Sequence, residues 1–125
     1  MAMPIPVLDV MTDDLEPWPM AAEQILSGPP RMASRDLYRA PDDSTWIAVW
    51  TCTAGSFWSR YAGDEAIYLI AGRARITDQD GRSATYRAGQ AILIRAGSRC
   101  TWEIEEPVRM LFHYRAGDDA GEVRS

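Results

Sequence analysis

From about residue 36 onward, the sequence consists of short runs of β-branched and aromatic residues, separated by turn residues at close and regular spacing. Such runs favour the pleated, half-buried surface of a strand, and their spacing is typical of an all-β sandwich or barrel. We therefore expect strands over residues 36–40, 44–53, 56–61, 65–72, 73–79, 83–87, 90–94, 100–105 and 108–114. Asp80 and Gly81 supply the positive φ angles of a tight hairpin turn between two of these strands.

One of the expected strands, TWIAVWTC at residues 45–52, is apolar on both faces. A strand that is covered on both sides belongs in a closed or double-layered architecture, with one face in the interior and the other under a second layer. The predicted fold class is therefore all-β, in the form of a small barrel.

The first 30 residues have a different character. Prolines interrupt residues 1–20, which we interpret as an extended arm, and MAAEQILSG predicts a short helix that ends at Gly28 before two prolines. The length of 125 residues fits one globular domain. We expect an arm and short helix over residues 1–30, a barrel over 31–117 and a C-terminal tail over 118–125.

The charged residues exclude several functions. All thirteen basic residues are arginine, which rules out Schiff-base chemistry, and the single histidine severely constrains histidine-dependent catalysis and metal sites. The net charge is −5 and no basic stripe is present, which argues against a nucleic-acid partner. The whole excess of acidic residues lies in the first 30 residues.

The two cysteines, Cys52 and Cys100, are too few and too far apart for a disulfide framework or a zinc knuckle. We expect two buried thiols in a reducing compartment. Residues 1–30 lack the basic and apolar regions of a signal peptide, and no apolar run reaches membrane-spanning length. These patterns predict a cytoplasmic protein with no membrane partner.

The glycine spacing and hairpin order resemble the cupin superfamily, whose fold is a jelly-roll β-barrel, also called a double-stranded β-helix. Glu65 and Gly72 match the end of the first cupin motif, and Gly89 and Gly97 match the glycines of the second. The segments WTCTAGSFWSRY, DEAIYLIAG and GSRCTWEIEEPVRM resemble single-domain cupins allied to ureidoglycine aminohydrolase and the ethanolamine-utilisation cupin. This resemblance covers residues 24–115.

The positions of the metal ligands depart from the cupin motifs. Ser59 and Tyr61 stand where the first motif has histidines, and Cys100 stands where the second motif has one. The resemblance implies that these three residues and Glu65 line the barrel interior. One carboxylate and one thiol do not make a comfortable catalytic zinc or facial-triad iron site. We expect no cofactor, with a divalent metal such as manganese or zinc as the alternative.

Glu65 is the candidate catalytic residue. From the sequence alone, a solvated turn acid like its neighbour Asp64 would be favoured, because glutamate is rarely buried unless it is paired. The family spacing reverses that preference and points Glu65 into the barrel, where burial and neighbouring groups would make it an acid or base.

Three further residues are candidate ligand-binding groups. Trp102 shares strand parity with Cys100, and Trp102 and Trp50 predict either an aromatic pocket wall or ordinary core packing. His113 lies on a strand face that is either solvent or pocket wall, and a lone strand histidine is more often structural than catalytic.

Two functions remain open. The first is a metal-independent cupin that binds a small polar or carboxylate-bearing metabolite in the barrel, with catalysis through Glu65 undecided. The second is a metal-dependent enzyme resembling ureidoglycine aminohydrolase, acting on a ureide or a related nitrogenous metabolite. The resemblance also implies a homodimer formed through an edge strand or the N-terminal arm.

Overall fold

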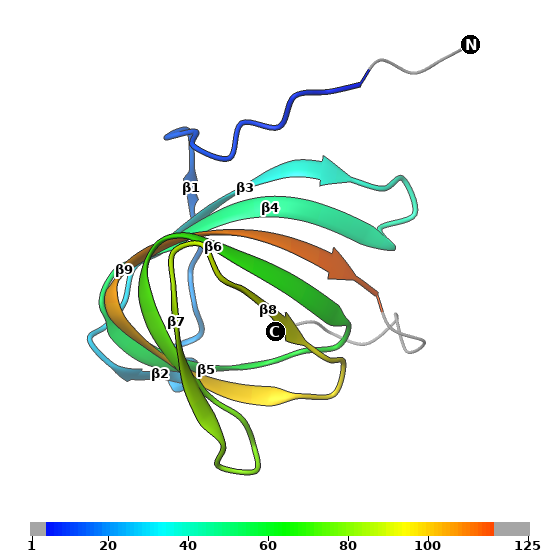
Figure 1. The fold of residues 1–125 in the computed structure, drawn as a ribbon. Coiled ribbons are helices and arrows are strands. Elements are labelled where there is room, and N and C mark those ends of the chain that lie inside the picture. The colour runs from blue at the N-terminus through cyan, green and yellow to red at the C-terminus, as the bar shows by residue number, and fades with distance from the viewer. Residues whose placement is uncertain (1–4, 117–125) are drawn as a thin grey trace.

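The computed structural model describes residues 5–116, and their regular secondary structure is almost entirely β-strand (Figure 1). The strands are β1 (Glu16–Pro17), β2 (Ile25–Ser27), β3 (Met32–Arg39), β4 (Thr45–Cys52), β5 (Gly55–Arg60), β6 (Asp64–Thr77), β7 (Ser83–Arg87), β8 (Ala91–Ile94) and β9 (Arg99–Arg115). One turn of 3-10 helix, η1 (Ala22–Gln24), precedes β2. The predicted all-β class is confirmed. No helix among the described residues is long and apolar enough to cross a membrane.

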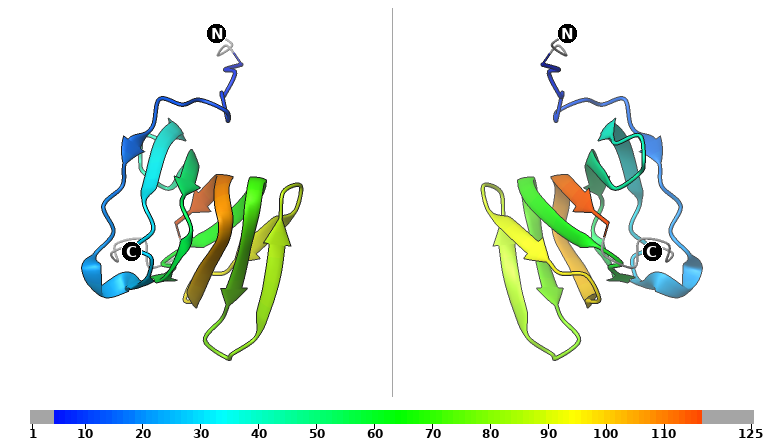
Figure 2. Two further views of the ribbon diagram at one scale, coloured as in Figure 1. Left: turned by 90° about the vertical axis from the view of Figure 1, so that its left-hand side faces the viewer. Right: turned by 90° about the vertical axis from the view of Figure 1, so that its right-hand side faces the viewer.

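The sheet is organised around the long strand β9. The first half of β9 pairs with β5 and its second half pairs with β4, while β6 runs antiparallel to it along most of its length. The path β1-β3-β4-β9-β5-β2 forms one part of the sheet, and β7 and β8 extend it from β6. The sheet is consequently curled around an interior, as the two side views show (Figure 2).

Two pairs of predicted strands are continuous in the structure, because 65–72 and 73–79 form β6 and 100–105 and 108–114 form β9. The ladder between β6 and β9 shifts register between Leu69 and Ala74. Gly72 has a φ of +89°, and an added Cβ would overlap the Pro107 carbonyl oxygen on β9. Gly72 therefore lets the paired strands bend at a close backbone approach without ending them.

Strand alternation places the core inside the curl. On β9, the side chains of Cys100, Trp102 and Ile104 are buried, while those of Thr101 and Glu103 between them are exposed. On β4, Trp50 points inward, and Val49 on the opposite face is also fully buried. The prediction that this strand is covered on both faces is thus confirmed for Trp50 and Val49.

The N-terminal arm covers part of the outer face. The Arg109 guanidinium donates hydrogen bonds to the carbonyl oxygens of Val10 and Thr12, each at 3.0 Å. Arg35, which pairs with Val49 across the β3–β4 ladder, donates to the Asp14 carbonyl oxygen at 2.7 Å. The arm is therefore held beside Val49, and it continues along β3 through β1 (Figure 2).

The region predicted as a short helix contains only the single turn η1. Ile25–Ser27 instead form β2, which pairs with β5 at an edge of the sheet. Tertiary pairing overrides a local helical pattern that is too short to be stable by itself. The predicted tail, residues 118–125, lies outside the described residues, and the homodimer stays a prediction.

Candidate functional site

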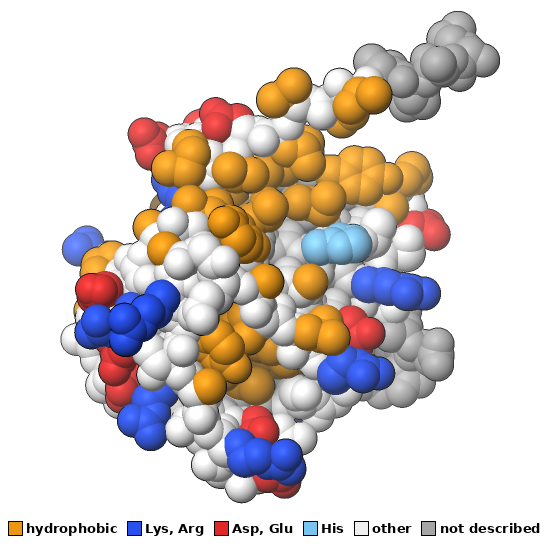
Figure 3. All heavy atoms as spheres, in the orientation of Figure 1, with side chains coloured by type: hydrophobic (Ala, Val, Ile, Leu, Met, Phe, Trp, Pro, Cys, Tyr) orange, Lys and Arg blue, Asp and Glu red, His pale blue; other side chains and the backbone are white. Residues whose placement is uncertain are grey.

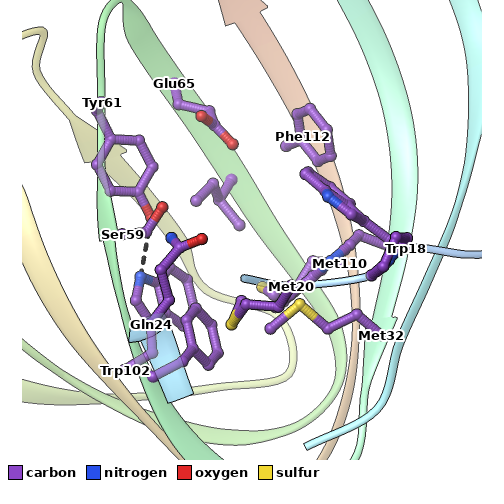
Figure 4. A pocket seen from close by; sticks show the side chains of 14 residues that line it. Trp18, Met20, Gln24, Met32, Ser59, Tyr61, Glu65, Trp102, Met110 and Phe112 are labelled. Atoms are coloured by element: carbon purple, nitrogen blue, oxygen red, sulfur yellow. Dashed lines mark hydrogen bonds between the residues drawn. The ribbon is translucent and has the colours of Figure 1, made fainter. Parts of the chain in front are cut away.

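A cavity of about 80 Å³ lies within the curled sheet (Figure 4). Strands β3, β4, β5, β6 and β9 and the N-terminal arm contribute its walls. Its lining consists of Trp18, Pro19, Met20, Gln24, Met32, Trp50, Phe57, Ser59, Tyr61, Glu65, Ile67, Trp102, Met110 and Phe112.

Glu65 is the charged group of the cavity. It lies on β6 with inward parity, is 5% exposed and points into the cavity (Figure 4). It is the one buried charged residue among residues 5–116. Its neighbour Asp64 stays with the turn, where its carboxylate accepts a hydrogen bond of 2.9 Å from the Ala96 amide. The predicted orientations of both acids are confirmed.

A buried hydrogen bond joins Tyr61 and Trp102. The Trp102 indole Nε1–H donates to the Tyr61 hydroxyl oxygen at 2.9 Å (Figure 4). Burial raises the pKa of Tyr61, and the negative charge of Glu65 raises it further, while hydrogen bonds with Trp102 and Ser59 act in the opposite direction. Tyr61 therefore remains a neutral phenol at neutral pH.

Aromatic rings form much of the cavity wall. Both phenylalanines of the chain and three of its five tryptophans are lining residues. Trp50, Phe57 and Trp102 pack together, with ring centroids 6.0–6.1 Å apart. Trp50 and Trp102 thus serve both as buried core and as cavity lining, so the two alternatives raised by the sequence do not exclude each other.

The arm contributes a wall that sequence reasoning did not assign to the site. Trp18, Met20 and Gln24 line the cavity, and the Gln24 amide donates to the Trp58 carbonyl oxygen at 3.1 Å. The Trp58 indole in turn donates to the Glu23 carbonyl oxygen at 3.1 Å. The available signal was the presence of large apolar residues in an otherwise acidic, proline-rich segment.

Two predicted ligand-binding residues do not reach this cavity. Cys100 is buried but lines a separate hollow under β7 and β8, and burial, then the nearby Asp78, raises the pKa of its thiol. His113 is exposed on the outer face of β9, with Nε2 2.7 Å from the Thr45 hydroxyl, and Figure 3 shows the histidine at the surface. Strand parity places the His113 side chain on the outer face of β9. Cys100 faces inward, but it lies beneath β7 and β8 and so lines a different hollow. The structure brings together Ser59, Tyr61, Glu65, Trp50 and Trp102.

The donor atoms of the cavity do not fit the metal of a cupin enzyme. The lining offers one carboxylate, a serine hydroxyl, a glutamine amide and a tyrosine whose pKa is raised, but no imidazole or thiol. Transition metals in such sites take imidazole, thiolate or several carboxylate ligands. In the described part of the chain, no group of three histidine, cysteine or acidic residues could hold a metal ion.

The buried Cys52 thiol makes the stability of the fold sensitive to alkaline pH. Burial raises the pKa of the Cys52 thiol from its ordinary value of 9.0 to about 12. Between these pH values, the unfolded chain releases this proton and the folded chain keeps it, so stability is lost as the pH rises. We expect the free energy of unfolding in urea to fall by about 1.4 kcal/mol per pH unit for this group.

The Cys52→Ala variant, measured beside the wild type at pH 8 and pH 10, isolates this contribution. The absolute stability of this variant will be lower, because the substitution leaves an empty space at position 52. Its free energy of unfolding should nevertheless fall less steeply with pH. An unchanged slope would show that the thiol is not shielded in the folded state.

Comparison with known proteins agrees with this fold. The profile of the EutQ-like cupin domain matches residues 39–114. Among solved structures, a protein of unknown function from Pseudomonas syringae is similar, with a TM-score of 0.77 and 27% identity over 86% of this chain. The match covers 46% of the Pseudomonas chain, so this chain spans about half of that length.

Two ethanolamine-utilisation structures share the fold at lower identity. A putative ethanolamine utilization protein Q from Salmonella typhimurium has a TM-score of 0.63 and 19% identity, covering 70% of this chain and 72% of that one. The Clostridium difficile EutQ protein has a TM-score of 0.63 and 22% identity, covering 75% and 69%. No curated protein matches the sequence. Because the family profile spans more than half of the residues, this chain belongs to the EutQ-like cupin domain family.

Proposed function

We propose that this protein binds a small molecule in the cavity inside its barrel, without a resident metal. The observation that carries the proposal is a buried carboxylate, Glu65, directed into a cavity with aromatic and thioether walls. Small-molecule sites have this composition, with an apolar lining and a few polar groups that fix orientation. A carboxylate has about four acceptor positions, so Glu65 can accept hydrogen bonds from a ligand in addition to its interactions within the chain.

Catalysis by Glu65 is a further part of the proposal. Glu65 and Tyr61 are the ionisable side chains of the lining, and the Tyr61 phenol holds its proton. Glu65 is therefore the group that would exchange a proton with a bound molecule. The alternative function, a metal-dependent aminohydrolase, would need ligand atoms that the lining does not supply.

The cellular context is also a proposal. The two free thiols, Cys52 and Cys100, support a reducing cytoplasmic location. The acidic net charge supports a small-molecule partner over a nucleic acid. A homodimer is proposed from the family resemblance.

Ligand-induced stabilisation tests the function. We expect at least one compound in a panel of amines, ureides, amino acids and sugar acids to raise the melting temperature. A ligand at 100 times its dissociation constant adds about 2.7 kcal/mol, which corresponds to several degrees for a domain of this size.

A cavity-filling substitution provides the control. Ile67→Phe places a larger side chain into the cavity and should abolish the shift, whereas Ile47→Phe, made on the outer face of β4, should retain it. If no compound stabilises the wild type, or if the shift persists in Ile67→Phe, the cavity is not the binding site.

A further inference from the structure

The cavity has no group that would balance the charge of an anion. Its fourteen lining residues include no arginine and no histidine, and Glu65 already places a carboxylate there. A second carboxylate, brought in by a ligand, would lie near the first in a partly desolvated site, where like charges repel strongly. The carboxylate-bearing metabolite expected from the sequence therefore does not suit this lining.

The same lining suits a positive charge. Figure 4 shows Glu65 between Tyr61 on one side and Phe112 on the other, with Trp18 and Trp102 on opposite sides of the cavity. Aromatic ring faces attract cations, and the attraction increases when the cation is desolvated. A carboxylate beside several such rings is a combination that recognises organic cations.

The surface of the protein provides a comparison. The Arg39 guanidinium lies 4.3 Å from the ring centroid of Trp46, and Arg99 lies 4.3 Å from that of Trp58. Within residues 5–116, the cavity tryptophans Trp18, Trp50 and Trp102 have no such arginine stacked on them. Phe57 covers one face of the Trp102 ring, so a cation would contact only those aromatic faces that remain toward the cavity, and it would have to come from outside the chain.

The apolar remainder of the lining narrows the class further. Met20, Met32, Met110 and Ile67 supply apolar surface without a strong hydrogen-bond acceptor, so methyl groups match them better than the N–H groups of a primary ammonium do. An alkylated ammonium has few or no N–H groups to satisfy and presents methyl groups to these side chains.

The volume limits the size of the bound group. The cavity, at about 80 Å³, is smaller than the cavity of about 150 Å³ that holds benzene in an engineered lysozyme. This volume limits the bound part of a ligand to one compact head group. Any longer chain would extend toward Pro19, the exposed residue of the lining.

We propose that the cavity binds a small alkylated ammonium group, held by the Glu65 carboxylate and the surrounding aromatic rings. This inference rests on the proposed function, because it names the ligand class of the same site.

A pair of probes that differ only in charge tests the inference. Choline and its neutral carbon isostere, 3,3-dimethylbutan-1-ol, have the same shape, and tetramethylammonium is the head group alone. Titration calorimetry on the full-length protein should give choline an affinity at least about tenfold higher than that of the isostere. Glu65→Gln should remove this difference by weakening choline, with little effect on the isostere.

Matched variants keep the result interpretable. Glu103→Gln makes the same change on the exposed face of β9 and should leave choline binding unchanged. If Glu65→Gln does not fold, as judged by circular dichroism, Trp18 decides: Trp18→Leu should weaken choline severalfold, and Trp18→Phe should restore most of the affinity. Loss of affinity in both Trp18 variants, or in neither, would contradict a cation–ring contact.

The possible failures are distinguishable. Equal affinities for choline and the neutral isostere would overturn the cation inference and leave the binding function intact. Binding of an anionic compound from the thermal-shift panel, with no binding of choline or tetramethylammonium, would also overturn the cation inference while leaving the binding function intact. If no compound binds at all, both the ligand class and the proposed function fail.

Discussion

Gly72→Ala should destabilise the protein by about 2–6 kcal/mol, through backbone strain together with overpacking. The φ of Gly72 is +89°, a conformation that alanine adopts only at a cost, and its Cβ would overlap the Pro107 carbonyl oxygen. That oxygen belongs to the backbone of β9, so no side-chain rotation relieves the overlap. Since natural domains are stable by only about 5–15 kcal/mol, this loss is a large share of the total.

Gly81→Ala is the matched control. Gly81 also has a positive φ, +84°, but an added Cβ there meets nothing within 4 Å. Its cost should be limited to the conformational penalty of about 1–2 kcal/mol. Urea denaturation of both variants separates the cost of the positive φ, which the two share, from the cost of the Cβ overlap, which only Gly72→Ala has. Equal losses in the two variants would contradict the close approach of β6 and β9 at Gly72.

Trp102→Ala should cost about 3–5 kcal/mol, the range for truncating a large aromatic residue in a core. Trp102 is 2% exposed, and its ring stacks on Phe57 and contacts Trp50 edge-on. The truncation also leaves the buried Tyr61 hydroxyl without its indole donor. Equilibrium unfolding in urea measures the loss. A change below about 1 kcal/mol would show that the ring is not packed as described.

A double-mutant cycle separates the hydrogen bond from the packing. Trp102→Phe keeps an aromatic ring but removes the indole N–H, and Tyr61→Phe removes the hydroxyl that accepts it. Each single change should cost about 1–3 kcal/mol, because it leaves a buried polar partner unsatisfied. The double variant should be more stable than the sum of the two losses predicts. Strict additivity would mean that the two groups do not interact.

The inward direction of Glu65 was predictable only through the resemblance to the cupin motif, because the residue type alone favours a solvated turn acid. Six residues lie between Glu65 and Gly72, and both fall on β6 as expected. The role of Gly72 was less accessible. Glycine permits both a turn and a bend under a facing strand, and only the pairing with β9 determines which one occurs.

For the residues whose positions differ from the sequence-based expectation, long-range packing determines where the side chain lies. Nothing local distinguishes a strand face that looks into the cavity from one that looks to solvent, so His113 could not be assigned from its alternation alone. Cys100 has the expected inward parity, but the hairpin of β7 and the short β8 determine which hollow it faces. The tertiary path of the arm likewise decides that Trp18 and Met20 become part of the site.

The cavity is complete only when the N-terminal arm is docked against the sheet. The inner part of the arm supplies the wall formed by Trp18, Met20 and Gln24, and Arg109 binds the outer part of the arm on the opposite face of the sheet. A site that is complete only while a segment is docked has an apparent dissociation constant equal to the intrinsic one divided by the docked fraction. If the proposed ligand binds, Arg109 would take part in setting its affinity without touching it, and the ligand would in turn favour the docked arm.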